Sequence, residues 1–212
     1  MKTLKLNKYE DVENIIFDFG GVLLDIDYQK TTNALESLLH EPAEFSQANQ
    51  SELFDAIETG HISPDQFRER LRAACKDAQI SDEKLDRAWN AMLGPIPKKK
   101  IELLKNLRAH YRKIYLLSNT NAIHIAAVEP AMAEAAGSVS AFEALFDEIY
   151  YSHHLRMRKP HVETFTKVIK DQNIEPKRTL FIDDSIQHIE GARRAGLQTH
   201  HLTGDLFDLF TG

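Results

Sequence analysis

Cysteine is almost absent from this sequence, because Cys75 is the only one among 212 residues. A single thiol excludes a disulfide framework and a zinc site built from several cysteines. The chain also lacks an apolar run of about 18 residues, the length that a membrane-spanning helix needs. Its first fourteen residues show no apolar segment of a secretory signal peptide. We therefore expect no membrane association and a soluble cytoplasmic protein.

The sequence also has no excess of positive charge. The chain carries 26 Lys and Arg against 32 Asp and Glu, a formal net charge of −6. Nucleic-acid-binding domains present a basic face, so we expect no nucleic-acid partner. The 42% hydrophobic and 27% charged content is ordinary for a globular protein of this length. The sequence leaves the oligomeric state open.

The stretch from Ile15 to Leu24 organises the rest of the sequence. Ile15-Ile16-Phe17 is a short apolar run typical of a buried strand, and it ends at Asp18. In an open α/β sheet, ligands bind at the carboxyl ends of the strands, which makes Asp18 a candidate site residue. Taken alone, the pattern also fits an Asp that caps a strand-to-turn junction.

Two periodicities divide the chain. Residues 31–93 have helical apolar spacing throughout, and Ser63-Pro64-Asp65-Gln66 is a capping box that opens one helix. From Pro97 onward helical and strand-like segments alternate, which predicts a mostly parallel sheet with helices on both faces. Strands are expected at 113–117, 148–151, 179–182 and 198–202, with a helix broken near Pro130 and another opening at Lys159-Pro160.

The helical block follows the first strand directly and is longer than an ordinary connection. We therefore predict an α/β fold with a Rossmann-like parallel-sheet core, formed by residues 1–28 and 96–212. An all-α cap of residues 29–95 is inserted over Asp18. Trp89 and Met92, at helical spacing, are predicted to lie in the core of the cap.

Polar residues follow the predicted strands: Asp18, Ser118-Asn119, Lys159 and Asp183-Asp184. Carboxylates on two strands can share a hard divalent cation such as Mg²⁺, which prefers oxygen ligands. A lysine and a serine hydroxyl can hold a phosphate oxygen beside that cation. The pattern therefore predicts a site for Mg²⁺ and a phosphate group, and we expect the partner to be a small phosphorylated metabolite.

These motifs resemble those of the haloacid dehalogenase superfamily of hydrolases. The matching segments, in the family's order, are Asp18-Phe19-Gly20-Gly21-Val22, Leu116-Leu117-Ser118-Asn119, Arg158-Lys159-Pro160 and Phe181-Ile182-Asp183-Asp184-Ser185. The resemblance covers the whole chain, including a helical cap between the first two motifs. It implies that the strands of the first and fourth motifs lie side by side.

The resemblance also implies roles for these residues. Asp18 would attack phosphorus and form an aspartyl phosphate that water hydrolyses. Mg²⁺ would be held by Asp18, the Gly20 carbonyl, Asp183 and Asp184. The phosphoryl oxygens would contact Phe19, Gly20, Ser118, Asn119 and Lys159.

Gly20 departs from the family pattern, because relatives carry there a second aspartate that protonates the leaving group. The loss of general acid catalysis typically costs about 10²–10⁴-fold in rate. The substrate can have a good leaving group, as in a sugar 1-phosphate. Asp25 or Asp27 can replace the missing acid, although both are typical of a solvated segment. Alternatively, the protein binds a phosphorylated ligand or a protein partner with little turnover.

Within the family, the Asp-x-Gly branch that includes glucose 1-phosphate-type phosphatases resembles this chain most. A 2-haloacid dehalogenase is a further alternative, although dehalogenases carry Asp-x-Tyr-Gly-Thr in the first motif. Two other positions depart from the family: Arg156 replaces a frequent Gly and His188 a frequent Asn. We expect neither to touch the metal ligands.

Overall fold

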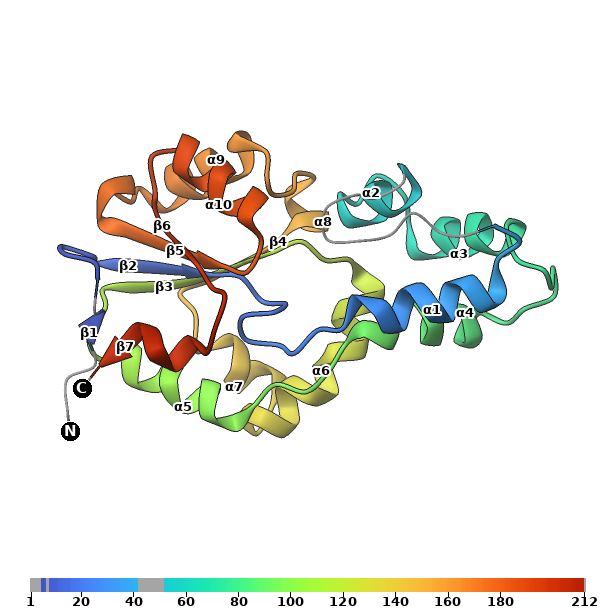
Figure 1. The fold of residues 1–212 in the computed structure, drawn as a ribbon, viewed down its shortest axis with the longest axis horizontal. Helices are drawn as coiled ribbons and strands as arrows, with labels where there is room; N and C mark the ends of the chain where they lie inside the picture. The colour runs from blue at the N-terminus through green and yellow to red at the C-terminus, as the bar shows by residue number, and fades with distance from the viewer. Residues whose placement is uncertain (1–4, 7, 42–51, 212) are drawn as a thin grey trace.

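The computed structural model describes residues 5–6, 8–41 and 52–211, so residues 42–51 of the expected helical block lie outside it. Figure 1 shows a layered α/β core at one end and a group of helices at the other. The strands are β1 (Lys5–Leu6), β2 (Asn14–Phe17), β3 (Lys113–Ser118), β4 (Glu148–Tyr151), β5 (Thr179–Asp183), β6 (Gln198–His201) and β7 (Phe210–Thr211).

The helices alternate with the strands after residue 97, as the sequence predicts. The described α-helices are α1 (Tyr28–Leu38), α2 (Glu52–Glu58), α3 (Pro64–Ala73), α4 (Asp82–Trp89), α5 (Lys98–Leu107), α6 (Ala122–Ala136), α7 (Val139–Glu143), α8 (Ser152–Leu155), α9 (Val162–Gln172) and α10 (Ile186–Arg194). Three short 3₁₀ segments complete the described elements: η1 (Asn90–Met92), η2 (Pro176–Arg178) and η3 (Leu206–Leu209). None of the described helices is both long and apolar enough to span a bilayer.

The main sheet has five strands in the order β4-β3-β2-β5-β6, and all four pairings are parallel. This confirms the predicted α/β class. β2 pairs with β5 on one side and with β3 on the other, so the strands of the first and fourth motifs are neighbours. The short antiparallel pair of β1 and β7 was not predicted.

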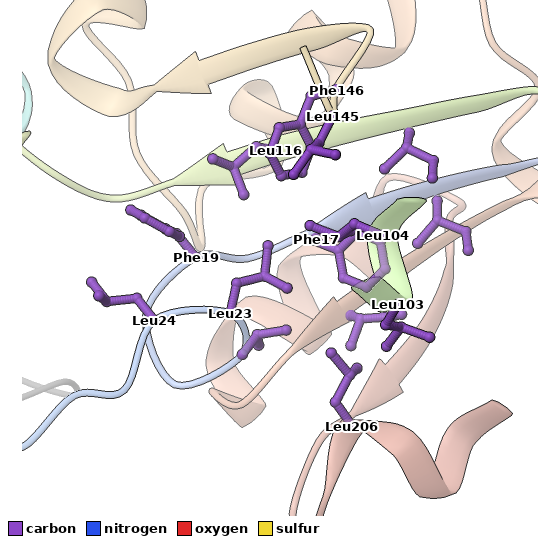
Figure 2. Close-up of a cluster of buried hydrophobic side chains, with 14 of the residues drawn as sticks. Phe17, Phe19, Leu23, Leu24, Leu103, Leu104, Leu116, Leu145, Phe146 and Leu206 are labelled. Atoms are coloured by element: carbon purple, nitrogen blue, oxygen red, sulfur yellow. The ribbon is translucent and has the colours of Figure 1, made fainter. Parts of the chain in front are cut away.

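Alternate residues of the central strand face opposite layers of helices. Ile15 and Phe17 pack in one apolar cluster with α5, α6 and α7, while Ile16 packs in another with α9 and α10. Successive strand side chains point to opposite faces, and helices cover both, so every residue of β2 is buried. Figure 2 shows the first cluster, with Phe17 close to Leu104 and with Leu103 and Leu116 nearby.

The cap helices α1 to α4 have an apolar core of their own, around Trp89. The indole is fully buried and stacks on Phe54, with ring centroids 4.9 Å apart. Met92 belongs to the same cluster, so the prediction for Trp89 and Met92 is confirmed. Ser63 and Gln66 form the predicted capping box at the start of α3. The exact domain boundaries, 28/29 and 95/96, stay a prediction.

Two helix predictions were wrong. α6 is not broken at Pro130 and continues to Ala136, because the proline is exposed while Ile123, Val128 and Met132 bury the opposite side of the helix. α9 begins at Val162 rather than at Pro160. The residue before a proline is disfavoured in helical conformation, which separates Lys159 from the helix.

Candidate active site

Two buried carboxylates from neighbouring strands meet at one lysine. Asp18 follows β2 directly and Asp183 ends β5, and the backbone N–H of Asp18 donates to the carbonyl of Ile182. Lys159 Nζ lies 2.6 Å from Asp18 Oδ1 and 2.7 Å from Asp183 Oδ2. The Lys159 side chain is fully buried, so its charge is balanced by these carboxylates rather than by water.

The side chain of Asn119 positions this lysine by binding the lysine's backbone. Its side-chain amide donates to the Lys159 carbonyl and accepts from the Lys159 N–H, both at 2.9 Å. Asn119 follows the end of β3, so the second motif holds the third in place. The oxygen and the nitrogen of the Asn119 side chain thus both contact the loop between α8 and α9, residues 156–161, which we call the lysine loop.

Burial and the neighbouring charges set the ionisation of this site. Burial raises the pKa of the Asp18 carboxyl; Lys159 opposes the shift and Asp183 adds to it. Burial also acts against the ionised form of Asp183, but Lys159 and His188 outweigh it and hold the Asp183 pKa at about 2. The pKa of Lys159 is raised because its two carboxylate partners outweigh its burial. Asp183 is therefore a permanent anion beside a permanent cation.

His188 corrects one expectation, because it does contact a predicted metal ligand. Its Nδ1 lies 3.0 Å from both carboxylate oxygens of Asp183. Burial and the nearby Lys159 lower the pKa of His188, so the neutral ring donates its Nδ1 hydrogen to Asp183. Arg156, the other departure, adopts the left-handed backbone region that favours glycine, with φ of 56°.

The acidic pair approaches the Gly20-Gly21 turn closely. Gly21 has φ of +74°, and a Cβ atom there would lie 2.3 Å from Asp184 Oδ2. Only glycine combines that conformation with that approach. Asp18, Asp183 and Asp184 each offer a carboxylate oxygen, and these oxygens lie within 4.8 Å of one another. Three carboxyl groups that bring oxygen atoms to one place form a donor set that fits Mg²⁺.

A pocket opens over Asp18 between the core and the cap. Its lining includes four of the predicted site residues besides Asp18: Phe19, Gly20, Ser118 and Asn119. Ser118 is the last residue of β3 and is buried. Lys159, Asp183 and Asp184 are not part of the lining, and Lys159 contacts Asp18 away from solvent.

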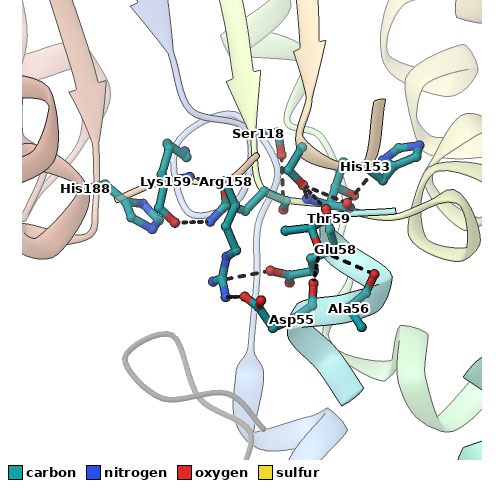
Figure 3. Close-up of polar contacts among 12 residues, drawn as sticks. Asp55, Ala56, Glu58, Thr59, Ser118, His153, Arg158, Lys159 and His188 are labelled. Atoms are coloured by element: carbon teal, nitrogen blue, oxygen red, sulfur yellow. Dashed lines mark hydrogen bonds and ion pairs between the residues drawn. The ribbon is translucent and has the colours of Figure 1, made fainter. Parts of the chain in front are cut away.

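One wall of the pocket joins the cap to the lysine loop. Figure 3 shows Arg158 reaching toward Asp55 and Glu58 on α2. Its guanidinium lies 2.7 Å from Asp55 Oδ1 and 3.3 Å from Glu58 Oε2. The Ser152 hydroxyl donates to the Glu58 carbonyl at 2.6 Å. The cap therefore contacts the residue that precedes Lys159.

Sequence reasoning missed several polar residues of this pocket, among them Tyr28, Glu58 and His124. A signal was present for two of them. Glu58 follows Phe54 by four positions, and His124 precedes Val128 by four, so each continues an apolar helical stripe. Polar residues in such a stripe are buried, but the stripe does not reveal which cavity they face.

The comparisons with known proteins agree with this geometry. A sequence model of haloacid dehalogenase-like hydrolases matches residues 12–196. The chain belongs to this hydrolase family. Its relatives include D-ribitol-5-phosphate phosphatase of Bacteroides thetaiotaomicron, 32% identical over 89% of this chain and 90% of the relative. A sesquiterpene phosphatase of Aspergillus oryzae is 26% identical, over 90% of each chain.

A solved structure of this family has the same fold. It is a mutant HAD family enzyme from Bacteroides thetaiotaomicron, in complex with magnesium and inorganic phosphate. The TM-score is 0.85 and the identity 33%, covering 93% of this chain and 98% of that chain. The protein is thus a haloacid dehalogenase-like hydrolase whose curated relatives include phosphatases.

The positions of Asp25 and Asp27 do not favour either residue as a replacement for the family's second aspartate. Ile26 lies where a side chain at position 20 would begin, since a Cβ on Gly20 would be 2.6 Å from Ile26 Cδ1. Asp25 and Asp27 are exposed and do not line the pocket. Asp25 lies 3.1 Å from Lys100 Nζ, while Asp27 caps α1 by accepting from the Gln29 N–H.

Replacing Asp27 by Asn is therefore expected to leave turnover of an alkyl phosphate unchanged within about twofold. Asparagine is as good an N-cap as aspartate, so the helix keeps its start. The measurement is kcat/KM for an ester with a poor leaving group. A loss of about 10²-fold or more would identify Asp27 as the general acid and contradict its placement.

Proposed function

We propose that this hydrolase is a Mg²⁺-dependent phosphatase that acts on a small phosphorylated metabolite through an aspartyl phosphate on Asp18. The observation that carries the proposal is the contact of Lys159 with both Asp18 and Asp183, beside Asp184. A carboxylate held next to an ammonium and an acidic pair, at the mouth of a capped pocket, has the surroundings that phosphoryl transfer requires.

The reaction would have two chemical steps, with Asp18 as the nucleophile of the first and water as that of the second. A carboxylate oxygen of Asp18 attacks phosphorus, the bond from phosphorus to the leaving oxygen breaks, and that oxygen takes a proton from water. A second water molecule then attacks the phosphorus of the aspartyl phosphate, which releases inorganic phosphate and restores the carboxylate. Ser118 and the backbone from Phe19 to Gly20 would contact the phosphoryl oxygens.

Lys159 and Asn119 position the nucleophile Asp18. Lys159 keeps one oxygen of Asp18 fixed and adds positive charge near the developing negative charge. Asn119 holds the lysine loop. Asp18, Asp183, Asp184 and the Gly20 carbonyl would hold Mg²⁺, which supplies further charge neutralisation when bound.

For the substrate, we propose a sugar or polyol phosphate. The absence of an acid at Gly20 favours a good leaving group, as in a sugar 1-phosphate. The similarity to D-ribitol-5-phosphate phosphatase instead favours a polyol 5-phosphate. The two substrates differ in their leaving groups: the sugar 1-phosphate has the better one, so it depends less on a general acid.

The test is phosphate release with and without Mg²⁺ from an aryl phosphate, a sugar 1-phosphate and a pentitol 5-phosphate. Release from at least one of them that depends on Mg²⁺ is the expected result. Halide release from a 2-haloacid without phosphate release would instead indicate a dehalogenase. Binding of phosphate esters without any turnover would indicate a binding module.

Magnesium is also expected to stabilise the fold. A ligand that binds only the folded state raises Tm, so Mg²⁺ should raise the Tm of the unmodified protein above its value in EDTA. Replacing Asp184 by Asn removes one anionic oxygen, and the shift should largely disappear. An equal Mg²⁺-dependent shift in this variant would place the cation elsewhere.

A further inference from the structure

The pocket over Asp18 also contains a neutral histidine. His124 lies on α6, three residues after the N-cap Asn121, and its side chain is buried, with the residue 6% exposed. It lines the same pocket as Asp18. Burial lowers the pKa of His124 to about 3, so the ring is uncharged at physiological pH.

The tautomer of this ring is set by Asn90. Asn90 Oδ1 lies 2.7 Å from His124 Nδ1, and an amide oxygen can only accept a hydrogen bond. Nδ1 therefore carries the proton, which leaves Nε2 of the neutral ring as an acceptor. Asn90 belongs to the cap, in η1, so the cap determines the hydrogen-bonding character of a core residue.

The ring is also fixed in orientation. It stacks on the buried Trp89 indole, with centroids 4.7 Å apart and an interplanar angle of 18°. The lining of the pocket mixes apolar side chains, among them Met92, Leu93 and Val128, with polar ones. A buried acceptor held in one orientation discriminates between ligands, because a ligand that offers it no donor leaves it unpaired.

We propose that His124 is a specificity-determining residue whose Nε2 accepts a hydrogen bond from a hydroxyl group of the substrate's leaving group. This inference rests on the proposed function and assigns a residue that would select phosphates of sugars or polyols by a hydroxyl group. The same pocket disfavours phosphate esters of purely hydrocarbon alcohols, which have no donor for Nε2.

Binding, separated from turnover, tests this assignment. In the full-length protein with Asp18→Asn and Mg²⁺, Kd is measured for a pentitol 5-phosphate and for pentyl phosphate, which has the same chain length and no hydroxyls. The preference for the pentitol ester is the ratio of the Kd for pentyl phosphate to the Kd for the pentitol ester. This ratio is expected to fall about 10-fold or more when His124→Phe is added. Phenylalanine preserves the stacking on Trp89.

Two further variants complete the design. His124→Gln retains an acceptor oxygen and should keep part of the preference. His153→Phe is the control, because burial also lowers the pKa of His153 and keeps its ring neutral, while the ring is only partly buried and lines a separate cavity. Its preference should equal that of the Asp18→Asn protein.

An unchanged preference in the His124→Phe variant would overturn the assignment, as would binding of neither ester to the Asp18→Asn protein. Failure of the proposed phosphatase activity has a different outcome. In that case the unmodified protein releases no phosphate, while the variants still show the His124-dependent preference.

Discussion

Replacing Asp18 by Asn is expected to lower kcat/KM for phosphate release by about 10⁴-fold or more, the scale on which removal of a covalent nucleophile acts. The amide has nearly the shape of the carboxylate but cannot attack phosphorus. The oxygen of the introduced amide can still accept from Lys159 Nζ, so the lysine keeps a partner. The expected change is therefore in chemistry far more than in folding.

Two measurements distinguish a lost nucleophile from a damaged fold. Mass spectrometry of acid-quenched reactions should find a phosphoryl adduct on the Asp18 peptide of the unmodified protein and none in the variant. Asp171→Asn is the control, because Asp171 is exposed on α9, where it pairs with Lys167. Retention of more than about a tenth of the activity by Asp18→Asn would exclude Asp18 as the nucleophile.

Replacing Lys159 by Met is expected to produce the largest loss of stability. The ammonium is fully buried between Asp18 and Asp183, and its removal leaves two buried carboxylates without their cation. Breaking a buried pair in this way typically costs about 3–5 kcal/mol. The measurement is the free energy of unfolding in urea, with EDTA present.

Magnesium and pH should both change the stability loss of the Lys159→Met variant. Saturating Mg²⁺ should restore part of the stability, because it brings positive charge to the same carboxylates. Without Lys159, the pKa values of both carboxyls in the folded state rise. That of Asp18 then lies further above its value in the unfolded chain, and that of Asp183 loses its main lowering influence. The folded state then loses stability as the pH rises through those raised values, so the deficit should shrink toward acidic pH.

Lys167→Met is the matched control for this experiment. Lys167 also pairs with an aspartate, but its side chain is 45% exposed. Exposed pairs of this kind contribute about 0–1 kcal/mol, so the control should unfold almost as the unmodified protein does. Equal stability losses for the two variants would show that burial does not make the Lys159 contacts special.

Much of this fold could be predicted because its determinants are local. The all-apolar run before Asp18 indicates a strand covered on both faces, and the capping box at Ser63 marks a helix start through contacts within four residues. The α6 helix shows the limit of such rules. Pro130 disfavours a helix locally, yet packing of one face of α6 holds the helix through it.

The candidate site likewise has features that the sequence predicts and features that it does not. Parallel strands end at one edge of a sheet, so residues that follow them are predictable as neighbours, and the structure brings Asp18, Lys159 and Asp183 together. The contact of His188 with Asp183 was not predictable. It depends on how α10 packs against β5, which no motif spacing specifies.

The sequence by itself determined the order of strands and helices, the inserted cap and the set of polar residues at the strand ends, since each follows from local periodicity or motif spacing. The tertiary structure decided what surrounds them. Lys159 became a buried bridge because the backbone of its loop is bound by Asn119. His124 became a neutral acceptor because Asn90 and Trp89 of the cap fold onto it. Such properties arise from contacts between segments far apart in the chain, where burial and the neighbouring charges decide which groups ionise.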